Sequence, residues 1–275
     1  MKFVYNEEKN QKMRHILMMQ PTIEEGEAAL AKDETDPEAW YVYATALGLK
    51  KRYDESIEAY SHGIACAPFY APNYFGRGRK YTATDRYWCA MADFTTCIQL
   101  DYSNWTYWYY RATAENLHND LEESVYDFTQ CMKYSAPEEH YPLVHWIYTT
   151  NVQLGKFDEA EAILNKIDAT VKEPRMDYGY ARSVRLYKGI VKPEEFIDIE
   201  GMKEVVLPRD HRVELELNGM LYGLYCYWTL HGDEQKAREA IEKLQTVAYK
   251  GAFGYTKSIP ICKKLGIEVG VPYEG

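Results

Sequence analysis

Large, small and polar side chains recur along this chain every 34 residues. From Trp40, one step of 34 residues leads to Tyr74 and a second step leads to Trp108. Other positions keep their size and polarity over the same steps, and matched columns in three consecutive units are not a product of chance. The further columns are Ala44, Gly78 and Ala112; Tyr53, Tyr87 and Leu121; Ser56, Ala90 and Ser124; Tyr60, Phe94 and Phe128; and Gly63, Cys97 and Cys131.

Each unit is predicted to be a pair of amphipathic helices. Within a unit, the apolar and small positions lie three and four residues apart, which is the spacing of one helix face. Small residues allow two helices to cross closely, and large residues fill the space between crossings. In the first unit these positions are Trp40, Tyr43, Ala44 and Leu47, followed by Tyr53, Ser56, Tyr60 and Gly63.

The order of these residue types resembles the tetratricopeptide repeat family. A large aromatic residue, a small one, a tyrosine, a second small one, a second aromatic one, a third small one and Pro68 follow one another at the period of that family. A fourth unit contains a well-matched turn at 154–160. The resemblance implies an all-α fold, a right-handed α-α superhelix of about six helix pairs with terminal capping helices.

Terminal repeats of a solenoid are normally atypical, because one of their faces meets water. We therefore interpret the irregular ends as caps and expect one continuous solenoid over residues 1–275. The fifth unit is degenerate, since Val191, Glu194 and Asp198 stand where its second helix needs an aromatic, a small and an apolar residue. We therefore expect a displaced helix at 192–206 and a hinge near 192–209. The expected parts are a capping pair at 1–35, with helices at 6–19 and 22–32; four regular repeats at 37–174; the degenerate repeat at 175–217; a last repeat at 218–250; and a cap and tail at 251–275.

Composition narrows the class of protein. The net charge of −10 and the pI near 5.3 argue against nucleic-acid binding, which needs Lys and Arg to replace phosphate counterions. No run of apolar residues is long enough to span a membrane. The first ten residues lack the apolar core of a signal peptide, so we expect a cytoplasmic protein with neutral or basic partners.

The six cysteines are expected to be reduced. None of their spacings is the CxxC of a metal knuckle or redox motif. Cys97 and Cys131 occupy equivalent small positions in neighbouring units, so both are predicted to be core residues and not disulfide partners.

The sequence contains no recognisable catalytic, metal or cofactor motif. It has no Walker loop, GxSxG elbow or HExxH pair. His62 and Cys66 are four residues apart, but no orienting group accompanies them. We therefore predict no catalytic residues, no metal ligands and no cofactor. Arg77 and Arg111 occupy a position between helices, where they are expected to pair with internal carboxylates.

The resemblance implies that the first helix of each unit lines a concave groove. The residue after each leading aromatic residue, and the residue four positions later, should then face a ligand as rigid rings with adaptable polar groups. The alternative is that these rings pack against neighbouring first helices, since apolar stripes at helical spacing are usually core. The predicted partner-binding residues are Tyr41, Thr45, Phe75, Arg79, Tyr109, Thr113, Asn116, His145, Thr149 and Tyr222.

These observations favour a non-catalytic scaffold that binds a protein or peptide partner in the groove. One alternative is an enzyme or small-molecule sensor with a pocket in the irregular region 189–218, under Tyr180, Tyr187, His211 and Tyr222. The other is a structural protein that self-associates through its C-terminal cap as a homo-oligomer.

Overall fold

The computed structural model describes residues 16, 18–169, 178–205 and 212–270. Within them every regular element is helical: fourteen α-helices, three 3-10 turns and no strand. The predicted all-α class with two helices per unit is confirmed. Most of the predicted capping helix at 6–19 lies outside the described residues, and so does His211 of the alternative pocket.

The chain divides into two compact units, residues 1–136 and residues 137–275. This boundary lies after the third regular repeat and not near 192–209. The single continuous solenoid and the hinge stay predictions, and the two units are described separately below.

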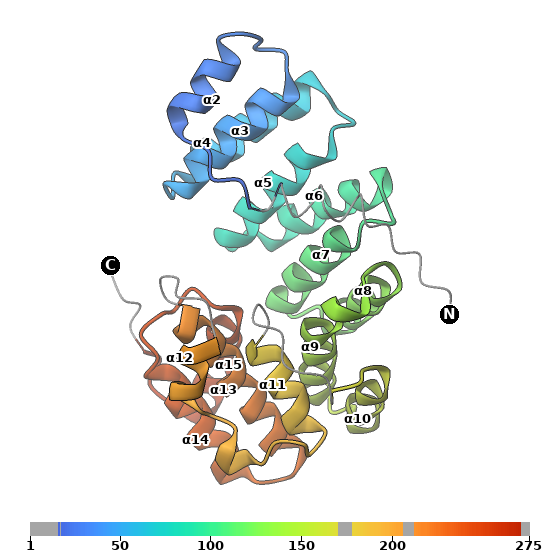
Figure 1. Cartoon of the computed structure of the whole chain (residues 1–275), viewed down its shortest axis with the longest axis vertical. Helices are drawn as coiled ribbons and strands as arrows, with labels where there is room; N and C mark the ends of the chain where they lie inside the picture. Colours follow the sequence, from blue (N-terminus) through green and yellow to red (C-terminus); the bar gives the residue numbers. More distant parts are fainter. Residues whose placement is uncertain (1–15, 17, 170–177, 206–211, 271–275) are drawn as a thin grey trace. The chain divides into compact units, whose positions relative to one another are not determined.

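Unit 1 keeps the 34-residue period in its backbone. Its helices α3, α5 and α7 begin at residues 37, 71 and 105, and each packs against the helix that follows it (Figure 1). Asp36 and Asn104 cap two of these first helices through their side chains. The helices of unit 1 are α2 (Ile23–Leu30), α3 (Pro37–Leu49), α4 (Tyr53–Cys66), α5 (Ala71–Ala83), α6 (Tyr87–Leu100), α7 (Trp105–His118) and α8 (Leu121–Tyr134).

Small polar residues at the crossings fasten each second helix to its first helix. The Ser56 hydroxyl donates to the carbonyl oxygen of Ala44 over 2.6 Å, and two repeats later Ser124 makes the same bond to Ala112 over 2.9 Å. Both serines are fully buried. The matched columns of the sequence are therefore matched contacts in space.

The cysteines that replace small residues also belong to this layer. Cys97 and Cys131 are fully buried, and their thiols donate to the carbonyl oxygens of Ala71 and Trp105. Their predicted role as core residues is confirmed. All six cysteines of the chain are free thiols.

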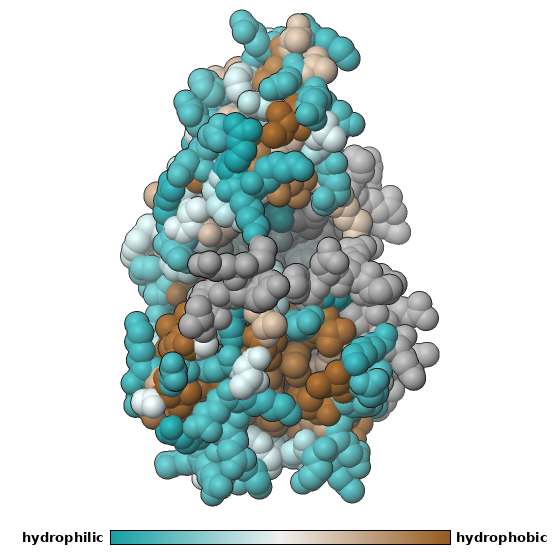
Figure 2. All heavy atoms as spheres, turned by 90° about the vertical axis from the view of Figure 1, so that its left-hand side faces the viewer, coloured by the Kyte–Doolittle hydropathy of each residue, from teal (hydrophilic) through white to brown (hydrophobic). Residues whose placement is uncertain are grey.

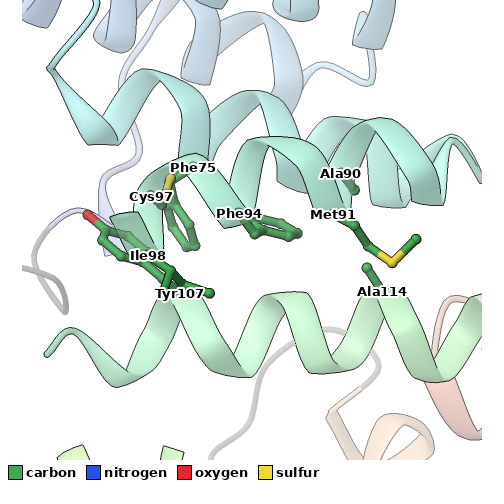
Figure 3. Close-up of a cluster of buried hydrophobic side chains, with 8 residues drawn as sticks. All are labelled: Phe75, Ala90, Met91, Phe94, Cys97, Ile98, Tyr107 and Ala114. Carbon is green, nitrogen blue, oxygen red and sulfur yellow. The ribbon is translucent and has the colours of Figure 1, made fainter. Parts of the chain in front are cut away.

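Aromatic rings fill the space between successive units. Figure 3 shows Phe75 from α5, Phe94 and Met91 from α6, and Tyr107 from α7 in one apolar cluster. The Phe75 and Phe94 ring centroids are 6.0 Å apart, and both rings are fully buried. Burial of aromatic rings of this size is a dominant source of stability.

The arginines predicted to lie between helices do pair with internal carboxylates. Arg77 donates to both carboxylate oxygens of Asp93 at 2.8 Å. Arg111 donates to both oxygens of Asp127 at 2.6 and 2.9 Å. This prediction is confirmed in the second and the third repeat, both of which lie in unit 1.

Unit 2 is less regular. Its helices are α9 (His140–Gln153), α10 (Phe157–Ile163), α11 (Tyr178–Tyr187), α12 (Ile199–Val205), α13 (Arg212–Leu230), α14 (Glu234–Gln245) and α15 (Phe253–Leu265), with 3-10 turns at Pro137–Glu139, Leu164–Lys166 and Pro193–Glu195. Helix α13 packs against α9, α11, α14 and α15, so it forms the centre of the unit. After α11 the expected second helix is replaced by a 3-10 turn and the short α12, in agreement with a degenerate fifth unit.

Replacing Phe94 by alanine should lower the free energy of unfolding by about 3–5 kcal/mol, because it leaves a cavity in a fully buried cluster. Gln99 lies on the same helix and is exposed, so Gln99→Ala should change that free energy by less than about 0.5 kcal/mol. Chemical denaturation of the two variants measures the difference. Equal losses would contradict the assignment of the core.

Candidate functional site

The first helices of unit 1 form one continuous surface. Helix α3 packs beside α5, and α5 packs beside α7, so the three helices line up. We call this surface the first-helix face. It contains most of the positions that the sequence predicts for partner binding. In the upper part of Figure 2, which belongs to unit 1, hydrophilic side chains frame the apolar residues that remain at the surface.

Two of the predicted anchor rings are buried and not exposed. Only 2% of Tyr41 and none of Phe75 is accessible to solvent. Tyr41 packs on Tyr60 with a centroid distance of 5.7 Å, and Phe75 packs between Phe94 and Tyr107. The expectation of an exposed aromatic ladder is therefore wrong at these positions, because each ring fills the space between neighbouring helices.

Most of the predicted polar groups bond within the protein. The Thr45 hydroxyl lies 2.9 Å from that of Tyr60, and the buried Thr113 donates to the carbonyl oxygen of Tyr109. The buried Asn116 donates to the Ser124 hydroxyl over 3.2 Å. Of the predicted partner-binding residues in unit 1, Thr45, Arg79 and Tyr109 are half-buried, so these three keep some surface for a ligand.

Arg79 differs from the other arginines of the unit. Its guanidinium lies over the rings of Phe75 and Tyr110, 5.7 and 5.5 Å from their centroids, and is half-buried. Among the described residues it has no hydrogen bond or ion pair to a carboxylate. The next residue, Lys80, has its pKa lowered to about 8 by burial and by the charge of Arg79. Within residues 18–136, the first-helix face therefore holds positive charge without a counterion.

The chain also covers part of unit 1 with its own residues. Ile16 packs against both apolar clusters, the one that contains Tyr41 and the one that contains Phe75. Met19 packs against the Tyr41 cluster. The sequence reasoning missed this contact; the only signal is a group of apolar residues before the first repeat.

The predicted residues of unit 2 are all core. His145, Thr149 and Tyr222 have no exposed surface. The Nδ1 atom of His145 lies 3.1 Å from the Tyr187 hydroxyl, and the Thr149 hydroxyl donates to the carbonyl oxygen of His145. Burial lowers the pKa of His145 to about 3, so its ring is neutral. The expected place of these residues on an exposed groove is wrong, because α9 is surrounded by α10, α11 and α13.

Rings fill the described space around Tyr187, whereas the alternative pocket at 189–218 stays a prediction because residues 206–211 lie outside the described residues. The Tyr187 ring stacks on the Tyr148 ring with centroids 3.8 Å apart. Gly223 approaches so closely that a Cβ atom there would lie 2.4 Å from the Tyr187 hydroxyl. Among the described residues, no group of three His, Cys, Asp or Glu side chains is arranged to hold a metal ion. No helix in the described part of the chain is long and apolar enough to cross a membrane.

Comparisons with known proteins identify the fold. No protein-family model matches the sequence, and no curated protein does. A tetratricopeptide repeat protein from Parabacteroides merdae matches in structure with a TM-score of 0.56 and 14% identity, over 88% of this chain and 89% of that one. YrrB, described as a tetratricopeptide repeat protein with an unusual peptide-binding site, matches with a TM-score of 0.52 and 13% identity, over 82% of this chain and 93% of that one. The chain has the tetratricopeptide fold over most of its length, as the sequence resemblance implied.

The buried neutral ring of His145 should make unit 2 sensitive to acid. Its pKa is about 3 in the folded protein, against 6.5 as its ordinary value, so the unfolded chain binds the proton first. The contribution of His145 is complete above pH 6.5 and is lost as the pH falls toward 3. Between these values the free energy of unfolding should fall by about 1.4 kcal/mol per pH unit more than in a His145→Asn variant.

Denaturant unfolding at several pH values tests this prediction. The exposed His231 supplies the control, since His231→Asn should leave the pH dependence of the wild-type protein unchanged. Parallel pH profiles of the wild-type protein and His145→Asn would rule out the buried histidine as the source.

Proposed function

We propose that this chain is a non-catalytic scaffold that binds a segment of another protein on the first-helix face of unit 1. In this proposal the ligand places a carboxylate against Arg79 and contacts the half-buried Thr45 and Tyr109. The observation that carries the proposal is the guanidinium of Arg79, which has no carboxylate partner in the part of the chain that the structure describes.

The other arginines on the first helices of unit 1 are paired with carboxylates, unlike Arg79. Arg77 and Arg111 each hold a carboxylate through two hydrogen bonds. Removing a charge from water without a counterion is costly, and two aromatic faces offset only part of that cost. A ligand carboxylate would supply the paired hydrogen bonds that guanidinium groups prefer.

The surroundings of Arg79 favour a protein ligand. Tyr110 and Phe75 hold the guanidinium from two helices, so it is positioned before a ligand arrives. Tyrosine and arginine side chains are enriched in protein-binding surfaces. YrrB, one of the proteins with a similar fold, is described as having a peptide-binding site.

The proposal that the scaffold is non-catalytic is supported by the surroundings of His62 and Cys66, the one nucleophile–base pair that the sequence suggested. The His62 ring stacks on Trp40 with centroids 4.8 Å apart, and the Cys66 thiol faces the carbonyl oxygen of Glu34. Each group therefore has a structural neighbour. Self-association through the C-terminal cap stays a prediction, and α15 of that cap packs against α13 and α14.

A photo-crosslinking residue at Tyr109 tests where the partner binds. The variant is exposed to lysate of the source cell, and the captured segment is identified by mass spectrometry and then synthesised as a peptide. Arg79→Gln should weaken binding of that peptide by about 2 kcal/mol, the range for a hydrogen-bonded charged pair. Calorimetric titration measures the loss.

Two controls separate a specific contact from a change in overall charge. Lys50 is exposed, so Lys50→Gln removes one positive charge elsewhere in the unit and should leave the affinity within about twofold. A peptide with its carboxylates replaced by amides should bind the wild-type protein and Arg79→Gln equally. If the carboxylate peptide itself binds a folded Arg79→Gln variant with unchanged affinity, the proposal fails.

A further inference from the structure

The two repeated arginine–aspartate pairs of unit 1 differ in one neighbour. Besides their aspartates, Arg77 donates to the Ser61 hydroxyl and Arg111 donates to the equivalent Thr95 hydroxyl, over 2.9 and 3.0 Å. Four residues after Arg77 the chain has Tyr81, whereas four residues after Arg111 it has Glu115. The second pair therefore carries an extra carboxyl group that the first pair does without.

Glu115 is buried without enough positive charge. It is 8% exposed, and its Oε1 atom lies 3.5 Å from Nε of Arg111, whose guanidinium already holds Asp127. Its Oε2 atom has no hydrogen-bond donor among the described residues, and the carboxyl group that adjoins it is that of Asp127. Since Arg77 and Asp93 form the same structural pair without a second carboxyl group, the fold does not require Glu115.

A surface pocket opens at this carboxyl group. Its volume is about 320 Å³, within the range that accommodates a small ligand group. Four carboxyl groups and one guanidinium line it, and Tyr126 adds a ring that is 59% exposed. The lining residues are Arg111, Glu115, Glu122, Glu123, Tyr126 and Asp127, all from α7 and α8.

Without counting Glu122, three carboxyl groups, those of Glu115, Glu123 and Asp127, face the single guanidinium of Arg111, so the pocket selects a cation. The placement of these groups selects an organic cation. Divalent metals need several oxygen ligands converging on one point, and the described residues contain no such group. Guanidinium and ammonium groups instead donate hydrogen bonds to separate acceptors and pack against aromatic faces. We propose that the Glu115 pocket binds the cationic head of an arginine or lysine side chain from a partner protein.

This site is distinct from the one proposed for Arg79. It attracts the opposite charge, and its residues lie on α7 and α8, whereas the proposed peptide site takes Thr45 from α3, Arg79 from α5 and Tyr109 from α7. It also agrees with the net charge of −10, which favours basic partners.

Proton release should accompany binding. Burial and the neighbouring Asp127 raise the pKa of Glu115 to about 8, so the empty site holds a proton at neutral pH. The facing groups are Arg111 on α7 and Asp127, Glu123 and the buried Cys131 on α8. On α6, Thr95 bonds to Arg111. A bound cation replaces the proton, so affinity should rise as the pH increases through about 8.

The cations of the remaining neighbour, α5, are held elsewhere. Arg77 is bound to Asp93, and Arg79 lies over Phe75 and Tyr110. No cation of α5 is therefore placed to neutralise the extra carboxyl group.

The test uses three small probes followed by NMR titration of the full chain: Nα-acetyl-arginine methylamide, Nα-acetyl-lysine methylamide and the neutral Nα-acetyl-citrulline methylamide. At least one cationic probe should bind about tenfold more tightly than the citrulline probe, and the tighter of the two identifies the preferred side chain. Its affinity should rise about 25-fold from pH 6.5 to pH 8.5. Glu115→Gln should lower its affinity about tenfold and remove the pH dependence.

Matched variants make the result specific. Glu159 is exposed on α10, so Glu159→Gln has the same change of charge and should not alter probe binding. Arg79→Gln should also leave it unchanged, which separates this site from the proposed peptide site. If Glu115→Gln does not fold, Glu123→Gln at the exposed rim should still weaken the cationic probe several-fold. Equal binding of cationic and neutral probes, or unchanged binding in a folded Glu115→Gln or Glu123→Gln variant, would overturn the proposal.

Discussion

The close crossing of paired helices is the constraint on which unit 1 depends. A Cβ atom at Gly78 would lie 2.7 Å from the Phe94 ring, and one at Gly76 would lie 2.3 Å from the Tyr60 ring. A large ring can occupy such a position only where the opposite helix has a glycine or another small residue. The repeat is therefore an alternation of rings and small residues, and its 34-residue spacing follows from the need to place each ring opposite the next gap.

This constraint explains which features the sequence could predict. Helical spacing identifies residues that share a face, so the helix pairs, the buried Cys97 and the inward-facing Arg77 and Arg111 followed from it. Spacing does not show whether a further layer covers that face. For this reason it could not separate the buried Tyr41 and Phe75 from the half-buried Tyr109, although all three occupy equivalent positions.

The candidate site was harder to predict, because it depends on which charges have partners. Spacing separated Arg79 from Arg77 and Arg111, but only the contacts show that Arg79 has no carboxylate partner among the described residues. Two of them hold aspartates through paired hydrogen bonds, whereas the third lies over aromatic rings. Equally, Glu115 has the ordinary spacing of a helical ion pair with Arg111. Its surplus charge becomes visible only once Asp127 is seen to occupy the same guanidinium.

The contact of Ile16 with both apolar clusters of unit 1 has a consequence for the strength of binding. A ligand that uses the same apolar area replaces a contact that the chain already makes within itself. Because the competing residue is tethered, its local concentration does not fall when the protein is diluted. The apparent dissociation constant then equals the intrinsic constant divided by the fraction of molecules in which this area is uncovered. Affinity for such a ligand is thus set partly by residues outside the repeats.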